Sequence, residues 1–188
     1  MSYYDDKKNV EQYIEMADGY DGAMLIDILR QNLVDDASVL ELGMGPGKDY
    51  LLLSQHFKVT GSDSSSVFVE RFLASHPKAD VIQLDAVTMK TERQFDAIYS
   101  NKVLYHLTRD ELAQSLQAQK SVLKPGGVAL HSFWHGEGDE EMHGLHFSYY
   151  TDEQLREIVQ PQYEIVKIAR YTEMETDDSL YIVLKNGA

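Results

Sequence analysis

A glycine-rich turn constrains the fold of this chain more than any other stretch. Residues 39–49 read VLELGMGPGKD, so a short apolar run passes through Glu41 into Gly43, Gly45 and Gly47. Glycines at alternate positions permit positive φ and let a ligand approach the backbone, because no Cβ is in the way. In an open α/β sheet such a turn lies at the carboxyl end of a strand, where ligands bind. The stretch predicts a buried strand, a turn that holds a nucleoside-containing ligand, and a helix.

Strand and helix patterns alternate along the rest of the chain. Helical periodicity over residues 10–33 is broken at 19–22, which predicts two helices with a bend. Capping boxes at Thr108 and Thr151 predict two more helix starts, and a polar loop is expected over 135–148. Strands are predicted at 38–42, 58–62, 81–84, 95–99, 128–133, 163–171 and 179–185. This order predicts an α/β fold with a parallel sheet, right-handed crossovers and a terminal antiparallel hairpin.

Composition excludes several classes of function. The 188 residues suit one domain, and the absence of cysteine excludes disulfides, thiolate metal sites and a cysteine nucleophile. A net charge of -14 disfavours a nucleic-acid partner and favours solubility, with attraction of a cationic substrate as the alternative. No apolar run approaches the roughly 18 residues of a membrane span, and the polar start lacks the apolar core of a secretory signal. We therefore expect a cytoplasmic protein without a membrane partner.

A carboxylate at the end of the second predicted strand narrows the choice of ligand. Asp63 stands 20 residues after Gly43, the spacing at which a carboxylate binds both ribose hydroxyls of an adenosine. Lys48 occupies the place of the third glycine in G-x-G-x-x-G, and Pro46 stiffens the turn, so a pyrophosphate fits less well. An NAD-dependent oxidoreductase would also need a second catalytic domain, and it is disfavoured.

Five segments in order carry a resemblance to a known family: ELGMGPGKD at 41–49, GSD at 61–63, LDA at 84–86, FDAIYSNKVLYHL at 95–107 and LKPGG at 123–127. Together they resemble class I S-adenosylmethionine-dependent methyltransferases, particularly the small-molecule, type 11/12-like members. The resemblance implies a three-layer, Rossmann-like, doubly wound sheet of seven strands, mostly parallel, whose last strand is inserted antiparallel beside its neighbour. We expect a single domain over 1–188, divided into a helical cap (1–34), a cofactor-binding core (35–135), and a lid loop, helix and hairpin (136–188).

The resemblance also implies where S-adenosylmethionine would bind. It places the methionine part of the cofactor beside Glu41, Gly43, Gly45 and Gly47, with Asp49 near the amino group. It places the ribose beside Asp63. The adenine would lie beside Ser64, Asp85 and Ala86, and the sulfonium beside Ser100 and Asn101. Ser64 departs from the family pattern, because that position is commonly apolar and packs on adenine. Carboxylates around an ammonium and a sulfonium are electrostatically favourable.

Candidate catalytic and substrate-binding residues follow the fourth and fifth predicted strands. Transfer from a sulfonium needs mainly an acceptor held in line about 3 Å from the methyl group, and a base only if the acceptor must lose a proton. His106 and Tyr105 lie where acceptors approach in this family and are the candidates for that base. Tyr20, His106, Trp134 and His135 are the predicted substrate-binding residues, and aromatic walls would suit a basic amine.

Four histidines near the fifth strand leave a choice open. His131, His135, His143 and His146 have spacings that permit a metal, but they span a strand end and a loop rather than one helix face. Substrate contact or base catalysis, and a solvated acidic lid, are the other interpretations; no metal is predicted.

The sequence therefore predicts methyl transfer from S-adenosylmethionine to a small molecule, with S-adenosylhomocysteine as product. A non-catalytic domain that binds S-adenosylmethionine, as a sensor or partner-binding module, is the alternative. SNKV after the fourth strand, in place of N/D-P-P-Y, disfavours adenine and glutamine as acceptors. The acceptor and the oligomeric state stay open.

Overall fold

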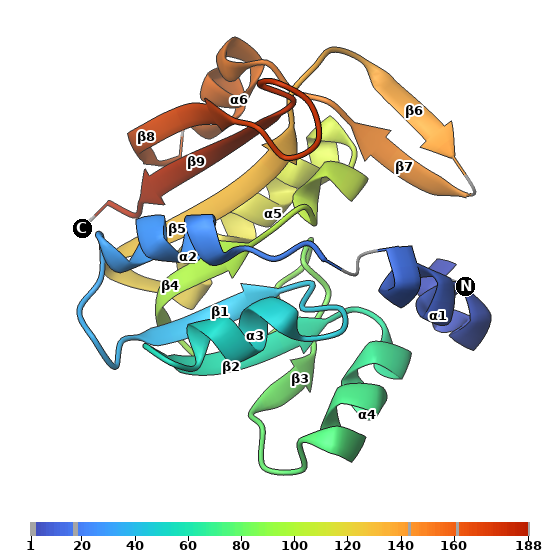
Figure 1. Cartoon of the computed structure of the whole chain (residues 1–188). Coiled ribbons are helices and arrows are strands. Elements are labelled where there is room, and N and C mark those ends of the chain that lie inside the picture. The colour runs from blue at the N-terminus through green and yellow to red at the C-terminus, as the bar shows by residue number, and fades with distance from the viewer. Residues whose placement is uncertain (1–2, 17–18, 143, 161, 188) are drawn as a thin grey trace.

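One seven-stranded sheet organises the computed structural model, which describes residues 3–16, 19–142, 144–160 and 162–187. The strand order is β3-β2-β1-β4-β5-β9-β8 (Figure 1). The five parallel strands are β1 (Ser38–Leu42), β2 (Lys58–Asp63), β3 (Val81–Gln83), β4 (Phe95–Ser100) and β5 (Leu123–Trp134). β9 (Ser179–Lys185) is antiparallel to both of its neighbours, β5 and β8 (Glu164–Tyr171). The expected α/β fold with an inserted antiparallel last strand is confirmed.

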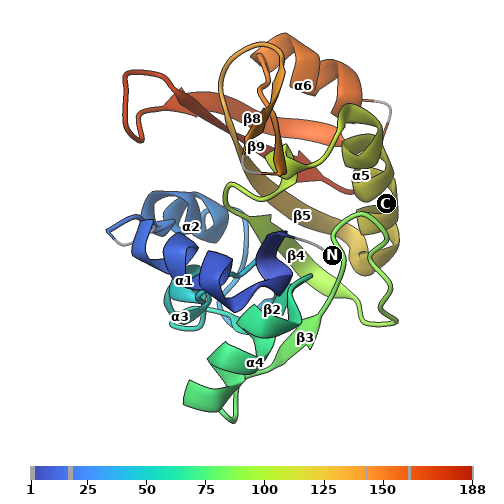
Figure 2. The same ribbon diagram turned by 90° about the vertical axis from the view of Figure 1, so that its right-hand side faces the viewer.

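Helices cover both faces of the sheet and make three layers (Figure 2). α2 (Ala23–Arg30), α3 (Lys48–Leu53) and α4 (Ser66–Ser75) pack on one face through a common apolar cluster. α5 (Arg109–Val122) and α6 (Asp152–Val159) pack on the other face. The short helix η1 (Tyr3–Asp5) and α1 (Lys7–Met16) lie against α4, and η2 (Leu104–His106) follows β4. Both predicted capping boxes are present, at Thr108 with Glu111 and at Thr151 with Gln154.

The central strands are apolar because both of their faces are buried. Val39 packs with the α2, α3 and α4 cluster, whereas Leu40 next to it packs with the α5 and α6 cluster, and both are fully buried. Successive side chains of a strand point to opposite faces, so a near-continuous apolar run is what a central parallel strand needs. Burying each such side chain stabilises the fold by roughly 1.5–3 kcal/mol.

The expected polar loop over 135–148 is wrong, because most of it forms a β-hairpin. β6 (Asp139–Met142) pairs antiparallel with β7 (Leu145–Ser148), and β7 packs on η2. All four residues of β6, DEEM, are exposed, and acidic residues have low strand propensity, so the sequence pattern gives little sign of a strand. His143 lies outside the described residues.

Two further details differ from the sequence pattern. The predicted strand at 128–133 begins earlier, with LKPGG as a bulged start of β5: α5 ends at Val122, β5 begins at Leu123, and its register against β4 shifts between Phe95 and Ala97. Between β3 and β4 the chain crosses over residues 84–94 without a helix, and Leu84 and Met89 fill that part of the core.

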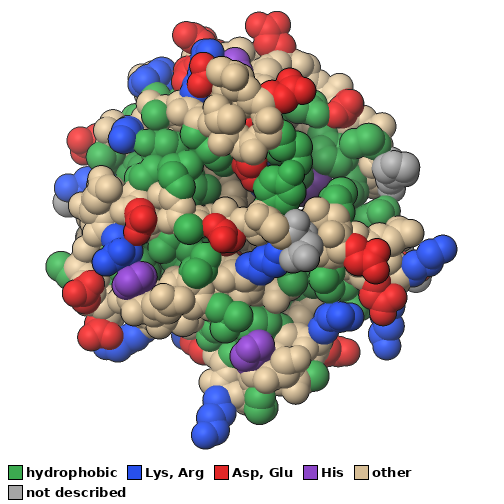
Figure 3. All heavy atoms as spheres, in the orientation of Figure 1, with side chains coloured by type: hydrophobic (Ala, Val, Ile, Leu, Met, Phe, Trp, Pro, Cys, Tyr) green, Lys and Arg blue, Asp and Glu red, His purple; other side chains and the backbone are tan. Residues whose placement is uncertain are grey.

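Two further observations bear on possible partners. Acidic and basic side chains are interspersed over the face shown in Figure 3. Among the residues that the structure describes, no helix is both long enough and apolar enough to cross a bilayer.

Candidate functional site

Two adjoining cavities lie at the carboxyl ends of β1, β2 and β4. The larger has a volume of about 370 Å³ and the smaller about 110 Å³, and both are lined by Tyr13, Gly43 and Lys102. Parallel strands end at the same edge of a sheet, so residues that follow different strands meet there. An elongated ligand can therefore occupy both cavities at once.

The glycine turn after β1 forms the floor between the cavities. Gly43 and Gly47 have φ of 62° and 86°, in the left-handed region. A Cβ on Gly43 would lie 2.5 Å from a methyl carbon of Val103, and a Cβ on Gly47 would lie 2.2 Å from the Phe72 ring, so only glycine fits at either position. Of the three predicted glycines, Gly43 and Gly45 line the cavities, whereas Gly47 packs against α4.

Asp63 at the end of β2 lines the larger cavity, as does Ser64. The two carboxylate oxygens of Asp63 accept hydrogen bonds from the N–H groups of Gly45 and Ser65, each 2.9 Å long. Burial raises the pKa of Asp63, and the backbone donors oppose that shift. Each carboxylate oxygen has a further lone pair, so both can still accept from a ribose hydroxyl. This geometry is compatible with the predicted ribose contact.

Glu41 is a buried acidic residue of the site with one oxygen left without a hydrogen-bond partner among the described residues. Its side chain is 3% exposed and lines the smaller cavity, and Oε2 has no hydrogen-bond partner among the described residues. Burial raises the pKa of Glu41 well above its ordinary value, and the negative charges of Asp49 and Asp63 add to the shift. An unpaired buried carboxylate is costly. A cationic ligand in the smaller cavity would remove that cost.

Asp49 lines the smaller cavity too, but its oxygens already have donors. Oδ1 accepts from the Gly22 N–H at 2.7 Å, and Oδ2 accepts from the Tyr99 hydroxyl at 2.7 Å and from Asn101 Nδ2 at 3.1 Å. Asp49 therefore joins the segment before α2 to the end of β4. Its predicted contact with an amino group stays a prediction.

Asp85 and Ala86 line the far end of the larger cavity, as expected for residues near an adenine. Asp85 Oδ1 accepts from the Thr88 N–H at 2.8 Å, and the Ala86 carbonyl accepts from the Ser115 hydroxyl at 2.6 Å. These bonds fix the loop after β3, which has no helix of its own to position it.

Ser100 and Asn101 point in different directions, although they are adjacent. Asn101 lines the smaller cavity, whereas Ser100 is fully buried and lines neither of these two cavities. Ser100 Oγ lies 2.8 Å from His131 Nδ1, and His131 Nε2 lies 3.0 Å from Gln119 Oε1. Burial lowers the pKa of His131 to about 3, so the ring is neutral. The side chain of Ser100 thus belongs to a buried polar chain.

His106, one of the two candidate bases, lines the larger cavity. Its Nδ1 lies 2.9 Å from the His146 carbonyl oxygen, which can only accept, so Nδ1 carries the hydrogen and the lone pair is on Nε2. Burial lowers the pKa of His106; the bond to the His146 carbonyl opposes the shift, and the His146 side chain adds to it. The ring is therefore neutral at pH 7, with Nε2 as its basic atom.

Tyr105 suits the role of base less well. It is buried and lines neither described cavity, and burial raises the pKa of its hydroxyl. Its ring lies 4.1 Å from the His106 ring, centroid to centroid, and so supports that imidazole.

The predicted substrate-binding residues do not gather in one place. His106 lines the larger cavity and Tyr20 the smaller, whereas Trp134 and His135 line neither of these described cavities. Trp134 packs under Lys102, whose Nζ lies 3.2 Å from the ring centroid. Within the described ranges, no three His, Asp or Glu residues are grouped closely enough to hold a metal ion.

Sequence reasoning expected aromatic walls and named His146 as a possible substrate contact, but it missed the other residues of the hairpin and the first tyrosines of the chain in the outer wall of the larger cavity. One side consists of Tyr3, Tyr4 and Tyr13 from the N-terminal segment, and the other of Gly144, Leu145 and His146 from the β6–β7 hairpin. It also missed Lys102 and Glu173 beside the smaller cavity. The tyrosine-rich start of the chain was an available signal. In the hairpin the histidines were the only signal, because the acidic stretch around them has little strand propensity.

Comparisons with known proteins agree with this geometry. Residues 39–127 match a family model described as methyltransferase domain. A trans-aconitate 2-methyltransferase of an Azoarcus species is 31% identical over 121 residues, which is 63% of this chain and 47% of that protein. A second one, from Methylobacterium radiotolerans, is 36% identical over 92 residues, 47% of this chain and 35% of that protein. The chain thus spans less than half the length of these curated relatives.

Solved structures share the whole fold at low sequence identity. An S-adenosylmethionine-dependent methyltransferase from Clostridium acetobutylicum has a TM-score of 0.75 at 16% identity, covering 95% of this chain and 99% of that one. The 1,6-didemethyltoxoflavin-N1-methyltransferase of Burkholderia thailandensis has a TM-score of 0.78 at 21% identity, covering 95% and 85%. Residues 39–127 are thus similar to a methyltransferase domain, and the solved structures show that this chain shares the fold of S-adenosylmethionine-dependent methyltransferases.

Proposed function

We propose that this protein transfers a methyl group from S-adenosylmethionine to a small-molecule acceptor and releases S-adenosylhomocysteine. The observation that carries the proposal is the pairing of two adjoining cavities with different carboxylates: Glu41, buried with an unpartnered oxygen, and Asp63, at the end of β2. A ligand with an ammonium at one end and a ribose at the other meets both requirements. The smaller cavity fits the amino-acid end, and the larger cavity fits the nucleoside.

The remaining outer part of the larger cavity is the proposed place for the acceptor. Bound S-adenosylmethionine supplies an already activated methyl group, so the protein has to orient the acceptor and, where needed, take its proton. The lone pair on His106 Nε2 is suited to accept that proton, because the His146 carbonyl holds the hydrogen on Nδ1. His106 is therefore the proposed general base.

A base is useful only for an acceptor that carries a proton on the reacting atom. We therefore favour a hydroxyl or an ammonium group, and the tyrosine wall formed by Tyr3, Tyr4 and Tyr13 adds cation–π stabilisation for an amine. The curated relatives are named for methylation of trans-aconitate, a carboxylic acid, whose carboxylate would need no base. Carboxylates are accordingly the second class of acceptor to test.

The test begins with binding and then measures turnover. Isothermal titration calorimetry with S-adenosylhomocysteine and with NAD should show binding of the first and not of the second. Methyl transfer is then measured by mass spectrometry against panels of amines, phenols and carboxylic acids, including trans-aconitate. Binding of NAD alone would refute the proposal. Tight binding of S-adenosylhomocysteine without turnover of any acceptor would instead favour the non-catalytic, ligand-binding alternative.

A further inference from the structure

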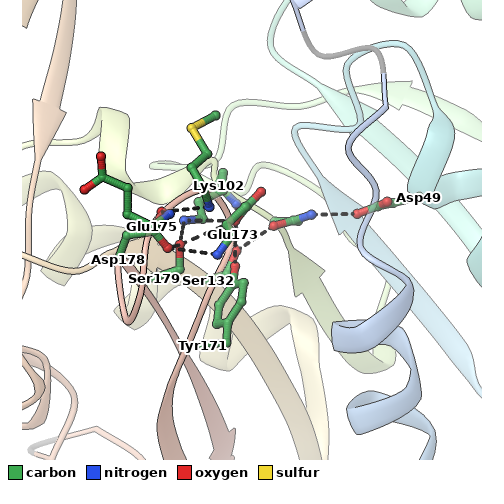
Figure 4. Close-up of polar contacts among 10 residues, drawn as sticks. Asp49, Lys102, Ser132, Tyr171, Glu173, Glu175, Asp178 and Ser179 are labelled. Carbon is green, nitrogen blue, oxygen red and sulfur yellow. Dashed lines mark hydrogen bonds and ion pairs between the residues drawn. The ribbon is translucent and has the colours of Figure 1, made fainter.

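The loop between β8 and β9, residues 172–178, reaches from the C-terminal hairpin to the smaller cavity. Glu173 in this loop and Lys102 in the loop after β4 both line that cavity, although they are far apart in sequence. Figure 4 shows the polar contacts that connect this loop through Lys102 to Asp49. The sheet order that places β9 beside β5 brings the loop to this edge.

The ammonium group of Lys102 holds the loop through contacts with three neighbouring groups. Nζ lies 2.7 Å from Ser179 Oγ, 3.2 Å from Glu173 Oε2 and 3.2 Å from the centroid of the Trp134 ring. Burial lowers the pKa of Lys102 to about 8, and the negative charges of Glu173 and Asp178 oppose that shift. The ammonium is therefore still charged at pH 7, and its partners leave it no donor for another anion.

Hydrogen bonds from the backbone of Lys102 continue to Asp49, which directly follows the glycine turn. The Lys102 N–H donates to Ser132 Oγ at 2.9 Å, and the Ser132 hydroxyl donates to Asn101 Oδ1 at 2.7 Å. Asn101 Nδ2 donates to Asp49 Oδ2 at 3.1 Å. Lys102 has a φ of 53°, a left-handed conformation that a residue with a Cβ adopts rarely and that needs such support.

The loop itself is ordered by Asp178. The carboxylate of Asp178 accepts from the backbone N–H groups of Glu173, Met174 and Glu175, each at 2.9 Å. Burial would raise the pKa of Asp178, but these donors outweigh it and lower the pKa to about 2. The position of Glu173 is thus set by its own loop before any ligand binds.

Glu173 keeps one carboxylate oxygen for a ligand. Its three donors, Lys102 Nζ, the Tyr171 hydroxyl at 3.1 Å and Ser179 Oγ at 3.5 Å, all reach Oε2. No donor among the described residues reaches Oε1, and the side chain lines the same cavity as the unpartnered Oε2 of Glu41. Two carboxylate oxygens with capacity to accept therefore face one small cavity.

We propose that Glu173 is a second ligand-binding carboxylate, which meets the ammonium of the ligand's amino-acid end together with Glu41, and that Lys102 is the residue that positions it. The C-terminal hairpin thereby contributes a wall to the site. Lys102 also balances the added negative charge, so the cavity gains an acceptor for the ligand without gaining an uncompensated carboxylate. This inference rests on the proposed function, because it assumes a ligand with an amino-acid end.

The experiment compares two ligands that differ only at that end. S-adenosylhomocysteine carries the amino-acid group, and 5′-methylthioadenosine lacks it. Glu173→Gln should weaken binding of S-adenosylhomocysteine about tenfold, the usual effect of a charged hydrogen bond, and change binding of 5′-methylthioadenosine less than twofold. Glu175→Gln, an exposed substitution in the same loop, is the matched control and should change neither. Affinities are measured by calorimetry, with the fold of each variant checked by circular dichroism.

The outcomes separate this inference from the proposed function. If the unsubstituted protein binds neither ligand, the proposed function is wrong, and this inference is overturned with it. If it binds S-adenosylhomocysteine and Glu173→Gln binds that ligand equally well, or loses both ligands equally, Glu173 is not a ligand-binding residue. Lys102→Met should reproduce the selective loss of S-adenosylhomocysteine; an equal loss of both ligands would make Lys102 a general structural support instead.

Discussion

The two ends of the site are built in different ways. The end beside Glu41 and Asp63 is formed by residues at the carboxyl ends of strands. Asp63 accepts two backbone hydrogen bonds, whereas Oε2 of Glu41 has no partner among the described residues. The outer end of the larger cavity is formed by the N-terminal segment and the β6–β7 hairpin, which are additions to the sheet. Strand register thus determines the proposed cofactor end, whereas the proposed acceptor end depends on segments that the sheet does not position.

The largest predicted effect is at the outer end. His106→Gln should lower kcat by about 10²–10⁴-fold, the usual contribution of a general base, and leave affinity for S-adenosylhomocysteine within twofold. Because burial lowers the pKa of His106 from 6.5, turnover of the unsubstituted protein should fall as the pH drops through a midpoint below 6.5, where Nε2 becomes protonated. The measurement is the rate of methyl transfer between pH 5 and 8.

The control for that prediction is His56→Gln, a histidine on the turn after α3, which should change neither rate nor affinity. Loss of affinity for S-adenosylhomocysteine in His106→Gln would make the residue structural. Unchanged turnover would mean that the acceptor needs no proton removed, as expected for a carboxylate.

The next largest predicted effect concerns the proposed contact between Asp63 and the ribose of the cofactor. Asp63→Ala should weaken S-adenosylhomocysteine binding by about 1–3 kcal/mol, because charged hydrogen bonds to the ribose are lost. The backbone N–H groups of Gly45 and Ser65 also lose their acceptor, so the melting temperature should fall as well. Asp85→Ala, at an exposed position of the same cavity, should have a smaller effect on affinity. Equal effects would mean that the ribose is not held at Asp63.

This contrast explains how much the sequence could predict. Glu41 lies at the end of a predicted strand, and Asp63, Asp85 and Asn101 each follow one. Parallel strands end together, so element order alone was enough to gather these residues. The same reasoning does not place the Ser100 side chain, because the alternation of side chains along β4 turns it toward His131. It also missed Lys102 and Glu173, since these two residues form their ion pair across 71 residues of sequence, which no local pattern encodes.

Ser100→Ala tests whether the Ser100 side chain is structural, and its expected effect is on stability rather than on binding. The Ser100 hydroxyl hydrogen bonds to His131 in the core, so removal should lower the free energy of unfolding by about 1–3 kcal/mol, the usual penalty for an unsatisfied buried group. Affinity for S-adenosylhomocysteine should stay unchanged. Urea unfolding and calorimetry measure the two quantities. Weaker binding at full stability would restore Ser100 to the place beside the sulfonium that the family resemblance implied.

The smallest predicted effect is the release of less than one proton per ligand bound. It tests whether the Glu41 carboxylate binds the ammonium group of the ligand. Burial and the neighbouring acids raise the pKa of Glu41 well above 4.5, which favours its protonated form in the absence of a ligand. An ammonium beside the carboxylate favours its charged form, so binding should release protons and grow tighter as the pH rises through that pKa. Calorimetry of S-adenosylhomocysteine in two buffers with different ionisation enthalpies measures the release, and Glu41→Gln should abolish it. Proton release that persists in Glu41→Gln would assign it to another group, with Asp63, whose pKa burial also raises, as the next candidate.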